Sequence, residues 1–235
     1  MSFGERIFLP YPRKITVMSV EEAILLRRSY RSFRSDPVNI EHLALILWSA
    51  YGISDPVNLF RVSPSAGATY PLEVYVAIGE RGVVDSTGFI PAGVYRYEPY
   101  THTLNPIKYG DIRRELARAA LDQIYIEEAP IDIVVTAIYR RTTRYYGKRG
   151  EIRYVPMDVG HMGQNIYLMA TALGYGTVAI GAFNDDEVAK VLGCSKEETP
   201  IYIMPIGVPR EYRKIDFSDI KIVIENNRKK LLRSI

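Results

Sequence analysis

The sequence is short of the residues that most often carry chemistry by themselves. Its 235 residues include one cysteine, Cys194, so no disulfide can form within the chain, which fits a reducing compartment. The three histidines, His42, His102 and His161, are too scattered for the spacing of a metal-binding motif. These absences argue against a metal-dependent enzyme, and we expect no metal site.

Long apolar runs are also missing. No stretch approaches the roughly 18 consecutive apolar residues that a membrane span requires, and the first residues lack the apolar run of a signal peptide. The net charge of +3 is less basic than that of a typical nucleic-acid-binding domain. We therefore expect a cytoplasmic protein that binds neither membrane nor nucleic acid.

The chain nevertheless has enough apolar residues, 47%, to bury one core. It contains no repeat, linker or low-complexity segment, so we expect a single domain over residues 1–235. Helical and strand patterns alternate without a steady β-α-β rhythm. The order of elements therefore favours an α+β sandwich over a doubly wound sheet.

Capping signals and apolar periodicity predict five helices. Ser19 and Glu22 form a capping box, and Asn39 and Asn184 are further N-caps. The expected helices span 19–28, 39–52, 110–119, about 158–173 and 184–192. Runs rich in β-branched and aromatic residues predict strands at 72–79, 93–97, 131–139, 201–208 and 220–224, with a short glycine-bounded strand inside 174–183.

Three arginines and a serine gather where the first helix should end: Arg27, Arg28, Ser29 and Arg31. A guanidinium is a planar fork of donors that matches phosphate oxygens. In an extended chain, Arg27, Ser29 and Arg31 would point to the same side, a suitable geometry for a phosphomonoester. The alternative is a solvated basic end that complements the helix dipole.

A run of small residues between prolines, 61–71, directly precedes the strand expected at 72–79. Small side chains let the backbone approach a flat ligand, although an ordinary surface turn has the same composition. Inside the long helix, Gly160 and Gly163 cost about 1 kcal/mol each relative to alanine, which indicates close packing or close ligand approach. Arg210, at the end of the 201–208 strand, is another candidate anion contact.

Together and in this order, these pieces resemble the nitroreductase family. The resemblance runs from about Ser19 to Arg210 and rests on RRSYRSF, PSAGATYP, GHMGQNIYLMATALGYGTVAIGAF and GVPR. It implies an α+β sandwich in which helices flank a mostly antiparallel sheet and a long central helix forms a homodimer. The segment 212–235 would be an extension that packs on the partner subunit.

The resemblance also implies two FMN sites at the subunit interface. Residues from one subunit would hold the phosphate, residues from the partner would line the ring, and a third group would lie near the flavin. The phosphate-binding residues would be Arg27, Arg28, Ser29, Arg31 and Arg210. The partner's ring-lining residues would be Pro64, Ser65, Ala66, Gly67 and Ala68. The residues near the flavin would be Gln164, Ile180 and Gly181.

The implied reaction is a ping-pong cycle. NAD(P)H reduces the flavin and leaves, and a small-molecule acceptor such as a quinone, a nitroaromatic or free flavin is then reduced. No side-chain acid, base or nucleophile is required. A non-catalytic flavin-binding protein of the same fold would carry the same motifs, and turnover with NAD(P)H would separate the two.

Within the family, the sequence looks most similar to the SagB-like branch, which includes dehydrogenases of thiazolines and oxazolines in modified peptides. Those enzymes carry a Lys-Tyr pair where this sequence has Tyr145 and Tyr146. Both tyrosines are candidate catalytic residues, but the missing lysine argues against azoline oxidation, which needs a base. The surrounding segment 140–149 could instead bind a nucleic-acid strand, although a mobile basic loop over the active site is the favoured interpretation.

Overall fold

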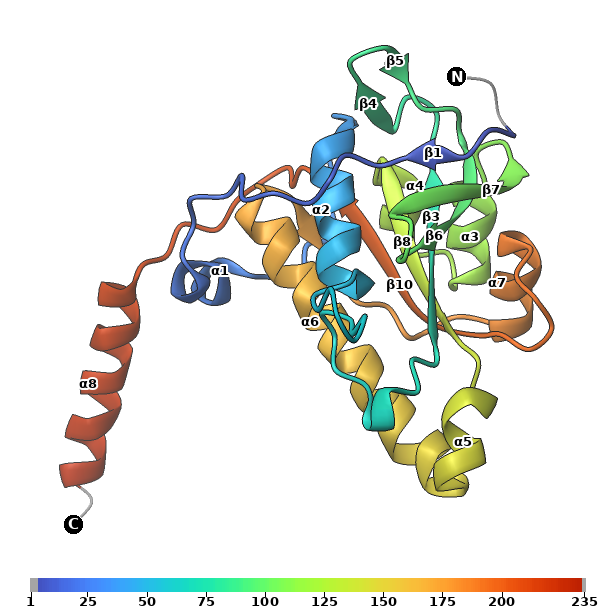
Figure 1. The fold of residues 1–235 in the computed structure, drawn as a ribbon. Helices are drawn as coiled ribbons and strands as arrows, with labels where there is room; N and C mark the ends of the chain where they lie inside the picture. Colours follow the sequence, from blue (N-terminus) through green and yellow to red (C-terminus); the bar gives the residue numbers. More distant parts are fainter. Residues whose placement is uncertain (1–3, 234–235) are drawn as a thin grey trace.

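The computed structural model describes residues 4–233. Within these residues, seven strands form one sheet in the order β1-β7-β6-β3-β8-β10-β9, and every neighbouring pair is antiparallel. A second sheet of three short strands, β2-β4-β5, lies at one end of the molecule (Figure 1). The strands are β1 Ile7–Phe8, β2 Val38–Asn39, β3 Leu72–Ile78, β4 Val83–Asp85, β5 Gly88–Phe89, β6 Gly93–Glu98, β7 Thr103–Tyr109, β8 Ile131–Ala137, β9 Gly176–Thr177 and β10 Thr199–Gly207.

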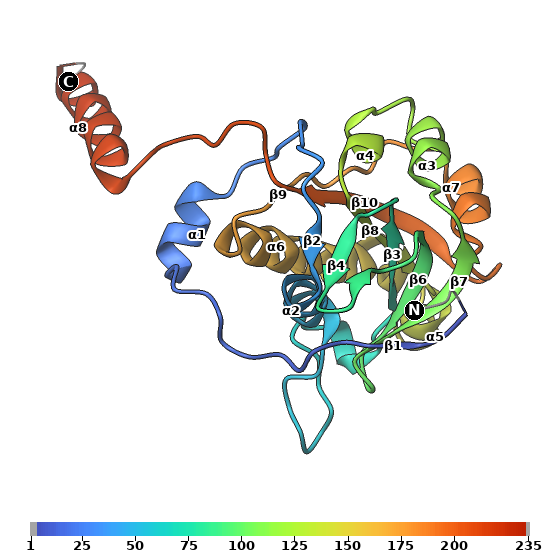
Figure 2. The ribbon, with the colours of Figure 1, turned by 90° about the horizontal axis from the view of Figure 1, so that it is seen from above.

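Helices cover both faces of the large sheet, as Figure 2 shows from above. One face packs on α2 and α6, and the other packs on α3, α4 and α7. The helices are α1 Val20–Leu26, α2 Ile40–Tyr51, α3 Arg113–Ala119, α4 Tyr125–Glu128, α5 Arg140–Tyr146, α6 Val155–Ala172, α7 Asp185–Leu192 and α8 Phe217–Arg233, with a 3-10 turn at Ala66–Ala68 and a π-helical turn at Gly150–Tyr154. The expected α+β architecture is confirmed.

The capping signals placed three helices correctly. Ser19 and Glu22 bond reciprocally at the start of α1, Asn39 accepts the N–H of Glu41 at the start of α2, and Asn184 caps α7. The central strands β3 and β8 have seven residues each and are buried throughout, because helices cover both faces. The sequence therefore located the middle of the sandwich.

Two expectations were wrong. The segment 220–224 is not a strand but lies inside α8, a helix of 17 residues. The segment 140–149 is not an irregular loop, because residues 140–146 form helix α5 and a π-helical turn follows before α6. Helix α5 packs beside the small-residue segment 61–71, and α8 projects from the body of the molecule (Figures 1 and 2).

In the part of the chain that the structure describes, no helix is long and apolar enough to cross a membrane.

One buried acid is out of place in this core. Asp132 on β8 is completely buried, and neither carboxyl oxygen has a hydrogen-bond partner within residues 4–233. The nearby Arg113 is already bonded to Asp111 and to the carbonyl of Ala129. Burial raises the pKa of Asp132 well above its usual range, and the charge of Arg113 only partly opposes this.

We predict that Asp132→Val raises the free energy of unfolding at pH 8 by about 1–3 kcal/mol, because it removes an unsatisfied buried group. The gain should shrink toward pH 5. A raised folded-state pKa means that the folded protein keeps a proton that the unfolded chain loses above about pH 4, so wild-type stability falls as pH rises from there. Urea unfolding at several pH values measures this difference.

The matched control is Asp132→Asn, which keeps buried polar atoms but cannot ionise. It should flatten the pH dependence and give a smaller gain than the valine variant. A wild-type protein whose stability follows the same pH profile as both variants would contradict the assignment.

Candidate active site

The arginine segment, residues 27–33, runs as an extended chain from the end of α1 past β9 and the end of β10. The N–H of Tyr30 donates to the carbonyl of Thr177 at 3.0 Å. Phe33 is fully buried and forms an antiparallel bridge with Pro209. The segment is therefore fixed to the large sheet along its length.

The hydroxyl of Tyr167 on α6 joins this segment to the rest of the site. It lies 2.9 Å from the hydroxyl of Ser29 and accepts the N–H of Ala179 at 2.8 Å. The guanidinium of Arg27 lies 5.1 Å from the centre of the same ring, within range of a cation–π contact. One tyrosine thus links α6, the arginine segment and the chain that comes after β9.

The predicted phosphate-binding arginines differ in what they are free to bind. The side chain of Arg28 donates to the carbonyl of Leu25 at 3.0 Å and to the carbonyl of Arg27 at 2.7 Å. Arg28 therefore caps the end of α1, as expected for a basic end that complements the helix dipole. Arg31 and Arg210 are exposed. The N–H of Arg210 donates to the carbonyl of Ser32 at 3.2 Å, which holds Arg210 beside the segment.

The chain after β9 offers fewer backbone groups than expected. Ile180 both donates to and accepts from Ile203, at 2.9 and 3.0 Å, so its N–H and C=O are used within the sheet. The two residues that follow, Gly181 and Ala182, are exposed. Gln164 is exposed on α6.

The second predicted element is the small-residue loop, residues 61–71. Its serine hydroxyls bond within the protein: Ser65 donates to Asp158 on α6 at 2.6 Å and accepts the N–H of Tyr70 at 3.0 Å. Ser65 therefore shapes the loop through its side chain. The outward surface of the loop is formed by Pro64, Gly67 and Ala68, which are all exposed.

The loop is strained. Gly67, Ala68 and Tyr70 have φ angles of 60°, 51° and 44°, and for the last two this left-handed conformation costs free energy. Such a conformation persists only where the surroundings impose it. A second tie to α6 contributes here, because Asn165 donates to the hydroxyl of Ser63 at 3.1 Å.

Arg61 closes the base of the loop. Its guanidinium lies 4.1, 4.9 and 5.4 Å from the ring centres of Tyr51, Tyr70 and Tyr100. The backbone N–H of Arg61 also donates to the hydroxyl of Tyr70 at 3.2 Å, so the two ends of the loop are joined. Cation–π contacts of this kind contribute about 0.5–2 kcal/mol each.

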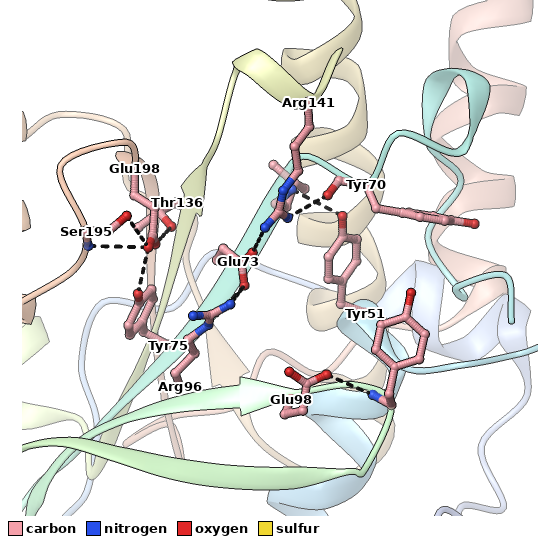
Figure 3. A network of polar contacts seen from close by, with 12 residues as sticks. Tyr51, Tyr70, Glu73, Tyr75, Arg96, Glu98, Thr136, Arg141, Ser195 and Glu198 are labelled. Atoms are coloured by element: carbon pink, nitrogen blue, oxygen red, sulfur yellow. Dashed lines mark hydrogen bonds and ion pairs between the residues drawn. The ribbon is translucent and has the colours of Figure 1, made fainter.

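Helix α5 holds the outer side of the loop. Arg141 donates to the carbonyl of Tyr70 at 3.0 Å and pairs with Glu73 at 2.5 Å, while Arg96 pairs with the same carboxylate at 2.8 Å (Figure 3). The hydroxyl of Thr142 lies 2.8 Å from the hydroxyl of Thr69. A buried carboxylate between two guanidiniums is a firm anchor for α5.

A cleft of about 350 Å³ opens between α5 and the loop. The two predicted catalytic candidates lie here: Tyr145 is 66% exposed, and the hydroxyl of Tyr146 stands over Gly67. A Cβ atom at Gly67 would collide with that hydroxyl, so the glycine permits the close approach. The cleft is lined by Gly67, Ala68, Thr69, Arg144, Tyr145 and Tyr146.

The charge around this cleft is lower than the sequence suggests. Arg141 shares the single negative charge of Glu73 with Arg96, and Lys148 pairs with Glu151 at 2.7 Å. Within residues 4–233, Arg144 and Arg149 form no ion pair, and the guanidinium of Arg144 lies 4.7 Å from the ring centre of Tyr145. The cleft therefore presents a stacked arginine and tyrosine more than a broad basic surface.

Reasoning from sequence missed four of the residues that shape the site: Arg61, Arg141, Asp158 and Tyr167. A tyrosine on the apolar face of a helix needs a partner for its hydroxyl, and this signal could have identified Tyr167. The others act through long-range contacts that no local pattern shows.

Comparison with known proteins now identifies the fold. The sequence model of the Nitroreductase family matches residues 24–208, which include both the arginine segment and the small-residue loop. The chain belongs to the nitroreductase family. The family supports an oxidoreductase function.

Individual relatives agree with this. A candidate nitroreductase of Methanocaldococcus jannaschii is 46% identical over 193 residues, covering 82% of this chain and 92% of that protein. A crystal structure of a candidate nitroreductase from Ralstonia eutropha superimposes with a TM-score of 0.77 at 28% identity, covering 90% of this chain and 93% of that one. The microcin B17-processing protein McbC of Escherichia coli is 28% identical over 176 residues, covering 72% of this chain and 62% of that protein.

Proposed function

We propose that this protein is an FMN-dependent oxidoreductase that uses NAD(P)H to reduce small-molecule acceptors such as quinones, nitroaromatics or free flavin. The observation that carries the proposal is one helix, α6, that fixes in each subunit the arginine segment of one flavin site and the small-residue loop of the other site of the dimer. Tyr167 holds the arginine segment, and Asp158 holds the small-residue loop. A cytoplasmic location is part of the same proposal.

The arginines fit a phosphate dianion. Within residues 4–233, Arg27, Arg31 and Arg210 form no ion pair, in contrast to Arg96 and Arg141, which share a carboxylate. Unpaired guanidiniums are the donors that a phosphate monoester needs, and the segment that carries Arg27 and Arg31 also carries the hydroxyl of Ser29. The small-residue loop exposes Pro64, Gly67 and Ala68, small residues that a ring can approach closely.

When bound, FMN would accept a hydride equivalent from NAD(P)H and pass electrons to the acceptor. The side chains of the protein bind and orient. Arg31, Arg210 and Ser29 would hold the phosphate, and Gly181 would offer its N–H near the ring. The cleft beside Tyr145 would admit the nicotinamide and then the acceptor.

We predict that Arg31→Ala weakens FMN binding by about 10- to 100-fold, because one charge-assisted hydrogen bond to the phosphate is lost. Riboflavin, which lacks the phosphate, should bind the variant and the wild type equally. Flavin fluorescence titration measures both. The control is Arg13→Ala, an exposed arginine paired with Glu41 away from the segment, and equal losses for both ligands would place Arg31 elsewhere.

We also propose a homodimer in which α8 packs on the partner subunit. In Figures 1 and 2, α8 projects from the body, and its apolar side chains include Ile222 and Val223, each 55% exposed. A free helix with such a surface is expected to be covered by another chain.

Val223→Glu should therefore convert a species of two chain masses into one of a single mass in light-scattering measurements. Glu225→Ala, about 200° around the helix from residue 223, should leave the dimer intact. A wild-type protein of one chain mass that retains its flavin would refute the dimer.

The likeness to the microcin-processing protein favours one second candidate, oxidation of azoline rings in modified peptides. The position that would hold the base is occupied by Tyr145, and a tyrosine hydroxyl is a poor base near neutral pH. The stacked Arg144 cannot replace it, since a guanidinium does not deprotonate.

We expect turnover of NADH or NADPH with menadione or a nitroaromatic, and none with an azoline peptide and oxygen. Consumption of the azoline peptide without NAD(P)H activity would reverse the assignment. Tyr145→Lys should introduce azoline oxidation if the base is all that is missing. Flavin binding without turnover of NAD(P)H with an acceptor, or of the azoline peptide with oxygen, would indicate a non-catalytic flavoprotein.

A further inference from the structure

Asp158 is an unusual residue for its place. It lies in the first turn of α6, is 4% exposed, and packs where the small-residue loop crosses the helix. Its carboxylate accepts the hydroxyl of Ser65 at 2.6 Å and the N–H of Ala66.

Burial raises the pKa of Asp158, and the bonds from Ser65 and Ala66 and the charge of His161 oppose this only in part. The ionised form of Asp158 therefore costs stability in the folded protein. A group that reduces stability and is directed at a strained loop is better explained by the conformation it imposes than by packing.

The direction of the hydrogen bonds shows how this works. A serine hydroxyl has one proton, and here Ser65 gives it to Asp158. The oxygen of Ser65 is then left to accept, and it accepts the N–H of Tyr70. Without the carboxylate, the hydroxyl proton could turn toward the side chain of Thr69, 3.5 Å away, and nothing would fix Ser65 in the rotamer whose oxygen accepts the N–H of Tyr70.

We propose that Asp158 is a positioning residue, whose carboxylate holds the small-residue loop, through Ser65 and Ala66, in the conformation that a flavin ring contacts. The inference rests on the proposed function for the identity of the ring. The conformation of the loop itself can be tested without any ligand.

The test uses the full chain with Asp158→Ala and Asp158→Asn. Hydrogen exchange of the flavin-free protein, followed by mass spectrometry, should show residues 62–72 exchanging about 10-fold faster or more in the alanine variant, with a smaller effect in the asparagine variant, which keeps one acceptor oxygen. Riboflavin affinity should fall by about 10-fold or more in Asp158→Ala. Ser65→Ala should reproduce the change in exchange from the side of the loop.

Thermal stability separates positioning from packing. The melting temperature of Asp158→Asn at pH 8 should equal or exceed that of the wild type, because a costly buried charge is gone. Asp85→Asn is the control, since Asp85 accepts two N–H groups in an exposed turn remote from the loop; it should leave exchange in 62–72 unchanged.

Unchanged exchange in 62–72, or faster exchange throughout the protein with a lower melting temperature in both Asp158 variants, would overturn the inference. Flavin binding by the wild type tests the proposed function separately. A wild type that binds no flavin would remove the ring from the proposal, while the exchange result would still decide whether Asp158 holds the loop.

Discussion

The position of α6 is the constraint on which the candidate site depends. Asp158 and Tyr167 are nine residues apart on this helix, which places them about 13 Å apart along its axis. One holds the small-residue loop and the other holds the arginine segment. Because the buried face of α6 packs on the large sheet, the spacing of the two elements is set by the core.

This dependence explains why the framework was easier to predict than the site. Capping boxes, the long apolar helix and the β-branched strands are local signals, and Ser19, Asn39 and Asn184 cap their helices as expected. The links that fix the site are long-range. Ser65 and Asp158 are 93 residues apart, and Ser29 and Tyr167 are 138 apart, so no window of sequence shows them.

The wrong strand at 220–224 has a similar physical origin. A short run in which apolar residues predominate fits a strand or a segment of helix equally well by periodicity. A local signal did exist, because Asp216 accepts the N–H and the hydroxyl of Ser218, and Asp219 accepts the N–H of Asp216, in the manner of an N-cap. Helix α5 lacked such a signal, since no side chain caps it.

The closed base of the small-residue loop has a thermodynamic consequence. Arg61 and Tyr70 join its two ends within one chain, and α5 and α6 hold its flanks. Ordering a residue costs about 1–2 kcal/mol of backbone entropy, and here that cost is met when the chain folds. A ligand that reaches the loop therefore meets a preorganised surface, and its affinity is not reduced by the entropy of ordering these eleven residues, 61–71.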